Sequence, residues 1–193
     1  MTLAALQHLI HSASALAEDR QFLVLGSASL LASFPELGET LSPLAATYDA
    51  DLCPQPFDEL TGLMLEEALG EHRAYFRRHG YHADILRDSI LETLPQGWRD
   101  RLVPVPNCPT ALALDPCDLA TVKLLVGRPK DLALVTLPHS SGLIDPAIIR
   151  SRIDCLDIPL ELPPRQLANF NHAFWVYPRS LRFDSYKFFS LYD

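Results

Sequence analysis

The spacing of apolar residues changes along the chain between two periods, and these periods predict its helices and strands. Leu3, Leu6 and Ile10 recur at helical spacing, whereas the short apolar run at 21–25 has the length of a buried strand. Asp115 followed by Pro116 is typical of a helix start, with the aspartate as the cap. The sequence predicts helices over 3–18, 27–33, 57–78, 115–126 and 130–137, and strands over 21–25, 46–52, 81–91 and 101–106.

The order of these elements indicates the fold class. Strands fall in the first half of the chain and helices dominate the second half, so we expect an α/β (α+β) fold with a small mixed β-sheet packed by helices. A length of 193 residues suits one domain with an appendage. We therefore expect a main domain at 1–160 and an aromatic-rich C-terminal extension at 161–193.

Composition excludes several classes of protein. With 48% hydrophobic and 21% charged residues, the chain is typical of a globular protein with a real core. The first twenty residues have no cationic start and no long apolar run, so we expect no signal peptide, no membrane partner and a cytoplasmic location. A formal net charge of −8 disfavours non-specific coating of nucleic acid. The four cysteines have no metal-binding spacing and are expected to be reduced, mostly buried thiols.

The C-terminal tail is unusually aromatic. Residues 170–193 contain nine of the seventeen aromatic residues, interleaved with Arg179, Arg182 and Lys187. Such a segment fits an arm packed back on the domain, a surface for a homo-oligomer or a protein partner, or a stacking platform for single-stranded nucleic acid. All three interpretations stay open.

Two aspartates in the second predicted strand carry the main chemical signal. Alternate residues of a strand point to the same side, so Asp49 and Asp51 present two carboxylates together, with nothing nearby in the sequence to neutralise them. Such a pair favours a divalent cation, and Mg²⁺ prefers hard oxygen ligands. Upstream, Gly26 allows close approach of a ligand to the backbone, and Ser27 begins a helix whose free N–H groups can bind phosphate.

A metal ion at the aspartates and a phosphate at the Gly-Ser turn together indicate a site for a nucleoside triphosphate (NTP). Each half has a simpler explanation when it is taken alone. The aspartates then decorate a solvent-facing strand, and the Gly-Ser pair is ordinary turn chemistry. The combination of strand, Gly-Ser, helix, loop and Asp-x-Asp strand is much more specific than either part.

This order resembles the nucleotidyltransferase-fold superfamily of the DNA polymerase β type, whose signature hG[GS] and [DE]-h-[DE]-h appears here as "LVLGSASLL" and "YDADL". The segments "FLVLGSASLLASFPE", "DADLCP", "LPQGWRDRLVPV" and "LDPCDLATVKLLVGRPKDLALV" look more closely like a family of small bacterial nucleotidyltransferase-like proteins. That family is related to the abortive-infection (AbiEii-type) toxins of toxin–antitoxin systems. The resemblance covers roughly 5–155.

The toxin group carries a second signature, K-x4-R-x-K-D, which this chain matches at Lys123, Arg128, Lys130 and Asp131. The resemblance implies that Lys123, Arg128 and Lys130 bind phosphate, and that Lys123 or Arg128 stabilises the pyrophosphate leaving group. From the residues alone, the alternative for Lys123 is a surface lysine on an amphipathic helix. Asp131 either caps the following helix or touches the substrate.

Enzymes of the polymerase β type carry a third carboxylate on a later strand. It acts as a base toward the attacking hydroxyl or completes a second metal site. Asp84 is the first candidate in this chain and Asp88 the second.

The resemblance implies transfer of a nucleoside monophosphate from an NTP to an acceptor hydroxyl on RNA, protein or a small molecule. Two Mg²⁺ ions at Asp49 and Asp51 would support the reaction, with Ser27 and its neighbouring amides holding the β- and γ-phosphates. It also implies that the protein is the toxin of such a pair, with an antitoxin or a second copy binding the aromatic tail. The alternative is a catalytically inactive module of the same fold that binds a nucleotide or a protein partner.

Overall fold

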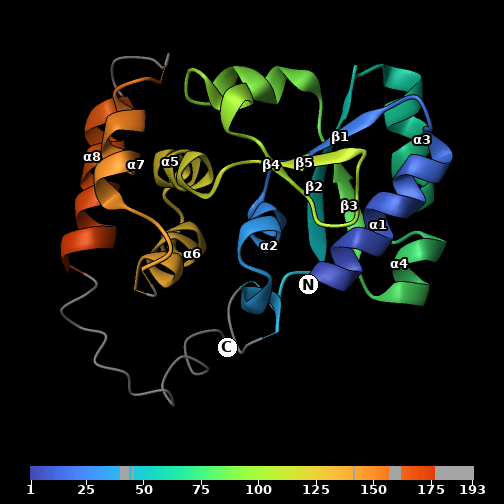
Figure 1. The fold of residues 1–193 in the computed structure, drawn as a ribbon, viewed down its shortest axis with the longest axis horizontal. Coiled ribbons are helices and arrows are strands. Elements are labelled where there is room, and N and C mark those ends of the chain that lie inside the picture. Colours follow the sequence, from blue (N-terminus) through green and yellow to red (C-terminus); the bar gives the residue numbers. More distant parts are fainter. Residues whose placement is uncertain (40–43, 45, 141, 157–161, 177–193) are drawn as a thin grey trace.

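The computed structural model describes residues 1–39, 44, 46–140, 142–156 and 162–176. At the centre lies one mixed β-sheet (Figure 1). Its strand order is β3-β2-β1-β5-β4. β1 pairs antiparallel with β2 and parallel with β5, β2 pairs parallel with β3, and β4 pairs antiparallel with β5. The strands are β1 (Gln21–Val24), β2 (Asp49–Gln55), β3 (His82–Ile85), β4 (Val103–Pro104) and β5 (Ala111–Ala113).

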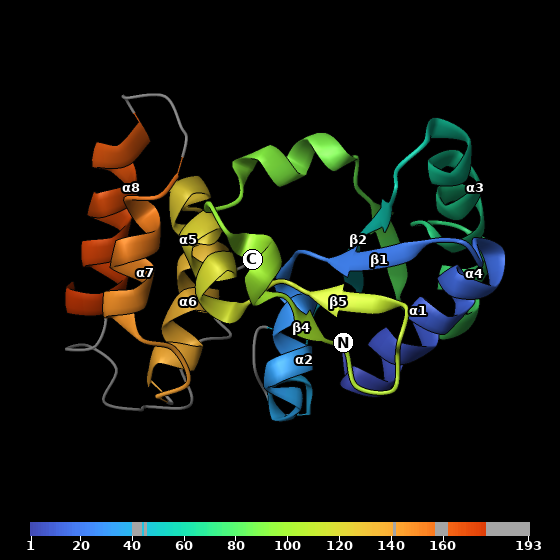
Figure 2. The same cartoon turned by 45° about the horizontal axis from the view of Figure 1, so that its top comes forward.

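Helices surround this sheet, and the mixed α/β fold predicted from the sequence is confirmed. Figures 1 and 2 show α1, α3 and α4 on one side of the sheet and a group formed by α5 to α8 on the other. Short 3₁₀ segments and a π-turn complete the chain. The α-helices are α1 (Leu3–Leu16), α2 (Leu30–Ser33), α3 (Glu59–Leu69), α4 (Ala74–His79), α5 (Pro116–Val126), α6 (Pro129–Ser140), α7 (Pro146–Ile153) and α8 (Leu162–Asn171). The 3₁₀ segments are η1 (Ser27–Ser29), η2 (Pro35–Gly38), η3 (Asp88–Thr93) and η4 (Trp98–Arg101), and the π-turn is η5 (His172–Val176).

Two apolar clusters form the interior of the described residues. The larger contains the sheet with α1, α2 and α3, and includes Phe22 and Leu52 with no exposed surface. The smaller joins α5 to α8 and η5 through residues such as Leu124 and Ile149. Phe34, which follows α2, packs against both clusters. The helical second half is therefore anchored to the sheet beside α2.

A buried ion network holds η4 against α5 and α7. Asp118 has no exposed surface, and Arg101 donates to it from Nε over 2.9 Å and from Nη2 over 3.0 Å. Arg152 of α7 lies 3.0 Å from the same carboxylate and also pairs with Asp115, the cap of α5. A buried charge is tolerated when it is paired and hydrogen-bonded, and this network meets that condition.

Several predicted elements differ in length from those observed. The predicted helix 57–78 breaks into α3 and α4, because Gly70 adopts an extended backbone and His72 a left-handed one. The predicted strand 81–91 ends at Ile85 and continues as η3, and the strand at 101–106 keeps only two residues. β5, α7 and α8 were not predicted.

Within the part of the chain that the structure describes, none of the helices combines the length and the apolar character that crossing a membrane requires.

Candidate functional site

Three aspartates share one face of the sheet. In β2, Asp49 and Asp51 alternate with the buried Ala50 and Leu52, as the sequence predicts. β3 lies parallel to β2 with Asp51 opposite Asp84, so that Asp84 points to the same face. The structure therefore brings the first candidate for a third carboxylate next to the predicted pair.

The second candidate lies elsewhere. Asp88 belongs to η3, beyond the end of β3 and outside this strand register.

Gly26 lies directly against one of these carboxylates. A Cβ built at this position would be 1.5 Å from Oδ2 of Asp51 and 2.5 Å from its Cγ. Its φ of −82° is ordinary for any residue, so the requirement for glycine is space and not backbone conformation. The sequence predicts close approach of a ligand to the Gly26 backbone, and the structure corrects this, because the Asp51 side chain occupies that space.

Ser27 begins a 3₁₀ turn and not a long helix. η1 spans three residues and runs into the four-residue α2. Two residues further on, Ser29 is fully buried, and its Oγ has no hydrogen-bond partner among the described residues. Apart from its place in the turn that follows Gly26, no pattern in the sequence marks Ser29.

The electrostatics of the aspartates reflect their crowding. Burial raises the pKa of Asp51, the positive charge of Lys123 opposes this shift, and the charges of Asp49 and Asp84 add to it. Burial likewise raises the pKa of Asp84, with His82 opposing and Asp49 contributing. The expectation that nothing neutralises the pair is corrected here, because α5 carries Lys123 close enough to act on Asp51. The repulsion that remains favours a cation at this face.

The K-x4-R-x-K-D segment folds around its last residue. Asp131 is 2% exposed, and its carboxylate accepts from the Arg128 backbone N–H over 3.2 Å, from Nε over 2.7 Å and from Nη2 over 3.1 Å. Nζ of Lys123 lies 3.5 Å from the same carboxylate. Its partners hold the pKa of Asp131 below the usual range despite its burial. The carboxylate thus fastens the turn between α5 and α6, in agreement with the capping interpretation.

The three cations differ in their freedom to meet a ligand. Lys123 is largely buried between Asp51 and Asp131, whereas the side chain of Arg128 is about half exposed at 53%. Lys130 is exposed in the first turn of α6, and no ion pair or hydrogen bond joins it to the carboxylates in the described part of the chain. The charges of Lys123 and Arg128 both interact with that of Asp51, and the charge of Lys123 lowers the pKa of Asp51.

A glycine turn sets the position of these cations. Gly127 ends α5 at φ +68°, and its N–H bonds to the Lys123 carbonyl. Asn169 of α8 donates to the Leu124 carbonyl over 2.8 Å and fills the space where a Gly127 side chain would lie. α8 therefore supports the turn between Lys123 and Arg128.

The donor set of the aspartate face suits Mg²⁺, because carboxylate oxygens are the ligands that this ion prefers. Among the described residues, however, no three His, Cys, Asp or Glu side chains converge closely enough to hold a metal ion. Mg²⁺ commonly uses one or two carboxylates and takes its remaining ligands from substrate phosphates and water. Asp49 and Asp51 fit that role, and the absence of a side chain at Gly26 gives the Asp51 carboxylate the space that it occupies.

A family described as "nucleotidyltransferase of unknown function (DUF6036)" matches residues 2–182. The chain belongs to this family. No curated protein and no solved structure matches this chain.

The DUF6036 match extends beyond the resemblance at 5–155 and takes in most of the aromatic tail. The start of that tail is part of the protein interior, because Phe170 and Phe174 lie in the smaller apolar cluster with Ala173. The rest of the tail, 177–193, lies outside the described residues. The structure therefore does not test the three interpretations of the tail. The relation to AbiEii-type toxins and to the polymerase β superfamily stays a prediction, and so does a domain boundary at residue 160.

Proposed function

We propose that this member of the DUF6036 family is a Mg²⁺-dependent nucleotidyltransferase that transfers a nucleoside monophosphate from an NTP to an acceptor hydroxyl. The observation that carries the proposal is the pairing of Asp51 with Asp84, which lines three carboxylates along one face beside Gly26. Lys123 adds a cation at the same place.

The residues divide the work by position. Asp49 and Asp51 would hold the metal together with the phosphates of the substrate. Lys123 and Arg128 would meet the negative charge of the pyrophosphate as it leaves. Asp84, with half of its side chain exposed, would face the acceptor. When bound, Mg²⁺ would neutralise charge on the triphosphate and on the attacked phosphate.

Metal and nucleotide are expected to bind together. Two carboxylates supply only part of the coordination that Mg²⁺ requires, so its affinity for the free protein should be low and should rise steeply when a triphosphate is present. The same reasoning expects weak binding of the triphosphate without metal, because Asp49 and Asp51 repel its charge.

Calorimetric titration tests this proposal. Each of the four ribonucleoside triphosphates is titrated, with and without Mg²⁺, into wild type, into Asp49→Ala/Asp51→Ala and into Asp154→Ala. Asp154 is an exposed aspartate of an ion pair within α7 and its cap, and serves as the matched control. Binding that needs both partners and is lost only in the double variant supports the proposal. Absence of binding by wild type contradicts it.

A second candidate function is a nucleotide-binding module without catalysis. It is favoured by the absence of a three-ligand metal group among the described residues. Incubation with Mg²⁺, the triphosphate that binds, and total RNA or cell protein as the source of acceptor hydroxyls separates the two. Release of pyrophosphate supports the enzyme, and stable binding of intact triphosphate supports the module.

A further inference from the structure

A histidine of the site strand contacts the third carboxylate. His82 lies in β3 opposite Asp49, on the same face as Asp84 two residues later. Its side chain is 10% exposed, and its Nε2 lies 3.3 Å from Oδ1 of Asp84. Its Nδ1 is buried and has no hydrogen-bond partner in the part of the chain that the structure describes. Asp84 is thus the polar group that anchors this buried ring.

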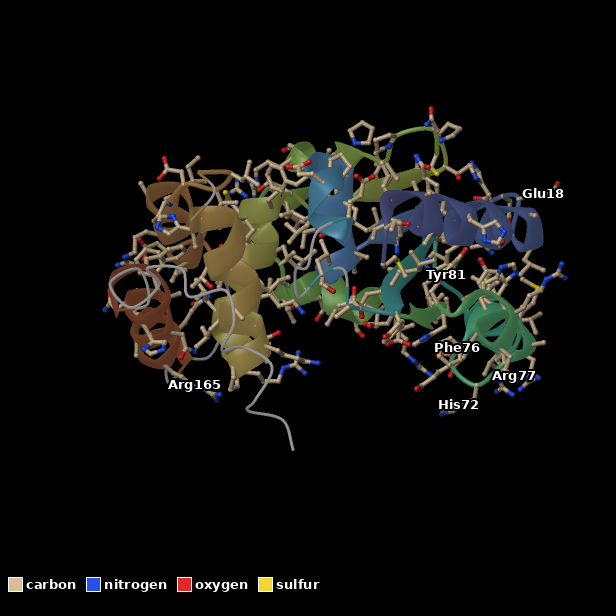
Figure 3. The ribbon with its side chains drawn as sticks, turned by 90° about the horizontal axis from the view of Figure 1, so that it is seen from below. Glu18, His72, Phe76, Arg77, Tyr81 and Arg165 are labelled. Atoms are coloured by element: carbon tan, nitrogen blue, oxygen red, sulfur yellow. The ribbon has the colours of Figure 1, made fainter. Side chains whose placement is uncertain are left out.

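The orientation of the ring is fixed by packing as well. Phe76 of α4 meets the His82 ring edge to face, with centroids 5.1 Å apart and planes at 81°. Figure 3 shows Phe76 beside α4 on the same side of the molecule as Tyr81, which directly precedes His82 in the chain. A ring packed in this way does not turn freely, so Nε2 stays directed at Asp84.

The Asp84 side chain is accessible to solvent although it contacts His82. Half of its side chain is exposed, in contrast to the imidazole that contacts it. To act as a third magnesium ligand, Asp84 would have to converge with Asp49 and Asp51 on one point. Among the described residues, no three His, Cys, Asp or Glu side chains converge in this way. The Asp84 carboxylate instead contacts His82, a residue of the same strand.

Resting on the proposed function, we propose that His82 is a positioning residue that holds Asp84 on the acceptor side of the site. Asp84 then takes the proton of the attacking hydroxyl and is not a third ligand of magnesium. In the step, the O–H bond of the acceptor breaks and its proton passes to Asp84. The acceptor oxygen bonds to the α-phosphorus, and the bond from that phosphorus to the bridging oxygen breaks, so pyrophosphate leaves with the electron pair.

One test needs neither metal nor substrate. In ¹⁵N NMR of the free protein, the His82 ring, assigned by its loss in His82→Gln, is expected to carry its hydrogen on Nε2, facing the carboxylate. Asp84→Ala is expected to change this signal, and Asp88→Ala, which removes a nearby carboxylate outside the strand register, is expected to leave it unchanged. A His82 signal that is indifferent to Asp84→Ala overturns the positioning contact, whether or not the protein binds nucleotide.

A second test separates the acceptor role from a metal-ligand role. Its probe is Mg²⁺ with the α,β-methylene analogue of the triphosphate that binds wild type. We expect His82→Leu and Asp84→Asn to change its Kd less than threefold, and Asp51→Asn to weaken it tenfold or more. Equal weakening by Asp84→Asn and Asp51→Asn would make Asp84 a metal ligand and overturn the proposal.

The rate of pyrophosphate release from the cleavable triphosphate, measured with total RNA or cell protein as the source of acceptor hydroxyls, completes the test. His82→Leu is expected to lower kcat tenfold or more at nearly unchanged KM, and His82→Gln, which keeps an N–H donor, is expected to recover most of it. The role of Asp84 as proton acceptor is overturned if KM rises in both variants. It is also overturned if wild type binds the triphosphate without releasing pyrophosphate. If wild type binds no nucleotide, the proposed function fails, and the NMR test alone decides the contact between His82 and Asp84.

Discussion

The contact between Gly26 and Asp51 predicts a loss of stability that one further substitution removes. In Gly26→Ala the new methyl group would lie 1.5 Å from Oδ2 of Asp51, far inside van der Waals contact. Because the backbone at Gly26 is ordinary for alanine, this overlap is the main cost. The Asp51 carboxylate must therefore leave its place, although it is partly buried and its backbone is fixed between two strands.

The magnitude follows from the geometry. Overpacking of a filled site costs about 1–3 kcal/mol, and we expect Gly26→Ala to lower the free energy of unfolding by that amount. In Asp51→Ala the overlapping atoms are gone, and the Cβ of residue 51, at 3.1 Å, is the nearest part of that side chain. That contact is tight but needs a shift of only a few tenths of an ångström, so the cost should fall below about 1 kcal/mol. The resulting coupling energy is about 1–2 kcal/mol.

Urea denaturation of wild type, both single variants and the double variant measures this coupling. Gly80→Ala, in both backgrounds, is the control, since Gly80 has φ +77° and no atom within 4 Å of a built Cβ. Its backbone strain should cost about 1–2 kcal/mol irrespective of residue 51. If Gly26→Ala costs the same with and without the Asp51 carboxylate, the reasoning about this contact is refuted.

Three further outcomes follow from the remaining geometry. Asp118→Ala should lower the free energy of unfolding by about 3 kcal/mol, because it leaves two paired arginines without their buried carboxylate. Asp154→Ala should change it by less than about 1 kcal/mol, and equal effects in urea denaturation would contradict the network. Asp51→Asn should gain stability over wild type as pH rises from about 4, since burial raises the pKa of Asp51 in the folded state and ionisation then favours unfolding. If urea denaturation finds the same difference in free energy of unfolding between Asp51→Asn and wild type at every pH, the raised pKa of Asp51 is contradicted. In native protein, iodoacetamide should modify the exposed Cys155 before Cys53, whose pKa burial raises to about 11; mass spectrometry that finds Cys53 modified as fast would contradict this.

Local periodicity predicted the parts of the site that lie within single elements. The alternation of Asp49 and Asp51 with buried residues is a property of one strand, and it was confirmed. The place of Asp84 beside Asp51 depends on which strands pair and in which register, and one sequence does not carry that information. For the same reason His82 was not predicted in the site, although its spacing of two residues from Asp84 was visible.

The missed elements have a common physical cause. β5 is a three-residue Ala-Leu-Ala segment with little intrinsic preference for a strand, and its pairing with β1 holds it in the sheet. α8 contains two prolines near its start, which obscure a helical pattern, yet its later side chains Gln166 and Asn169 donate hydrogen bonds to carbonyl groups of α5. In both, contacts with distant segments decide the local structure.

The division of the interior into two clusters explains how the site is assembled. The aspartates come from the sheet in the larger cluster, whereas Lys123 comes from α5 and Arg128 from the turn between α5 and α6, both helices of which contribute to the smaller cluster. The positive charge of Lys123 acts on Asp51 and so has in part the effect that a metal ion would have at that carboxylate. If a triphosphate bound with Mg²⁺, the attraction between Lys123 and Asp51 would be replaced by two others. Asp51 would attract the metal ion, and Lys123 would attract the phosphates. Binding is therefore expected to tighten the contact between the two clusters, with the nucleotide phosphates lying between their opposite charges.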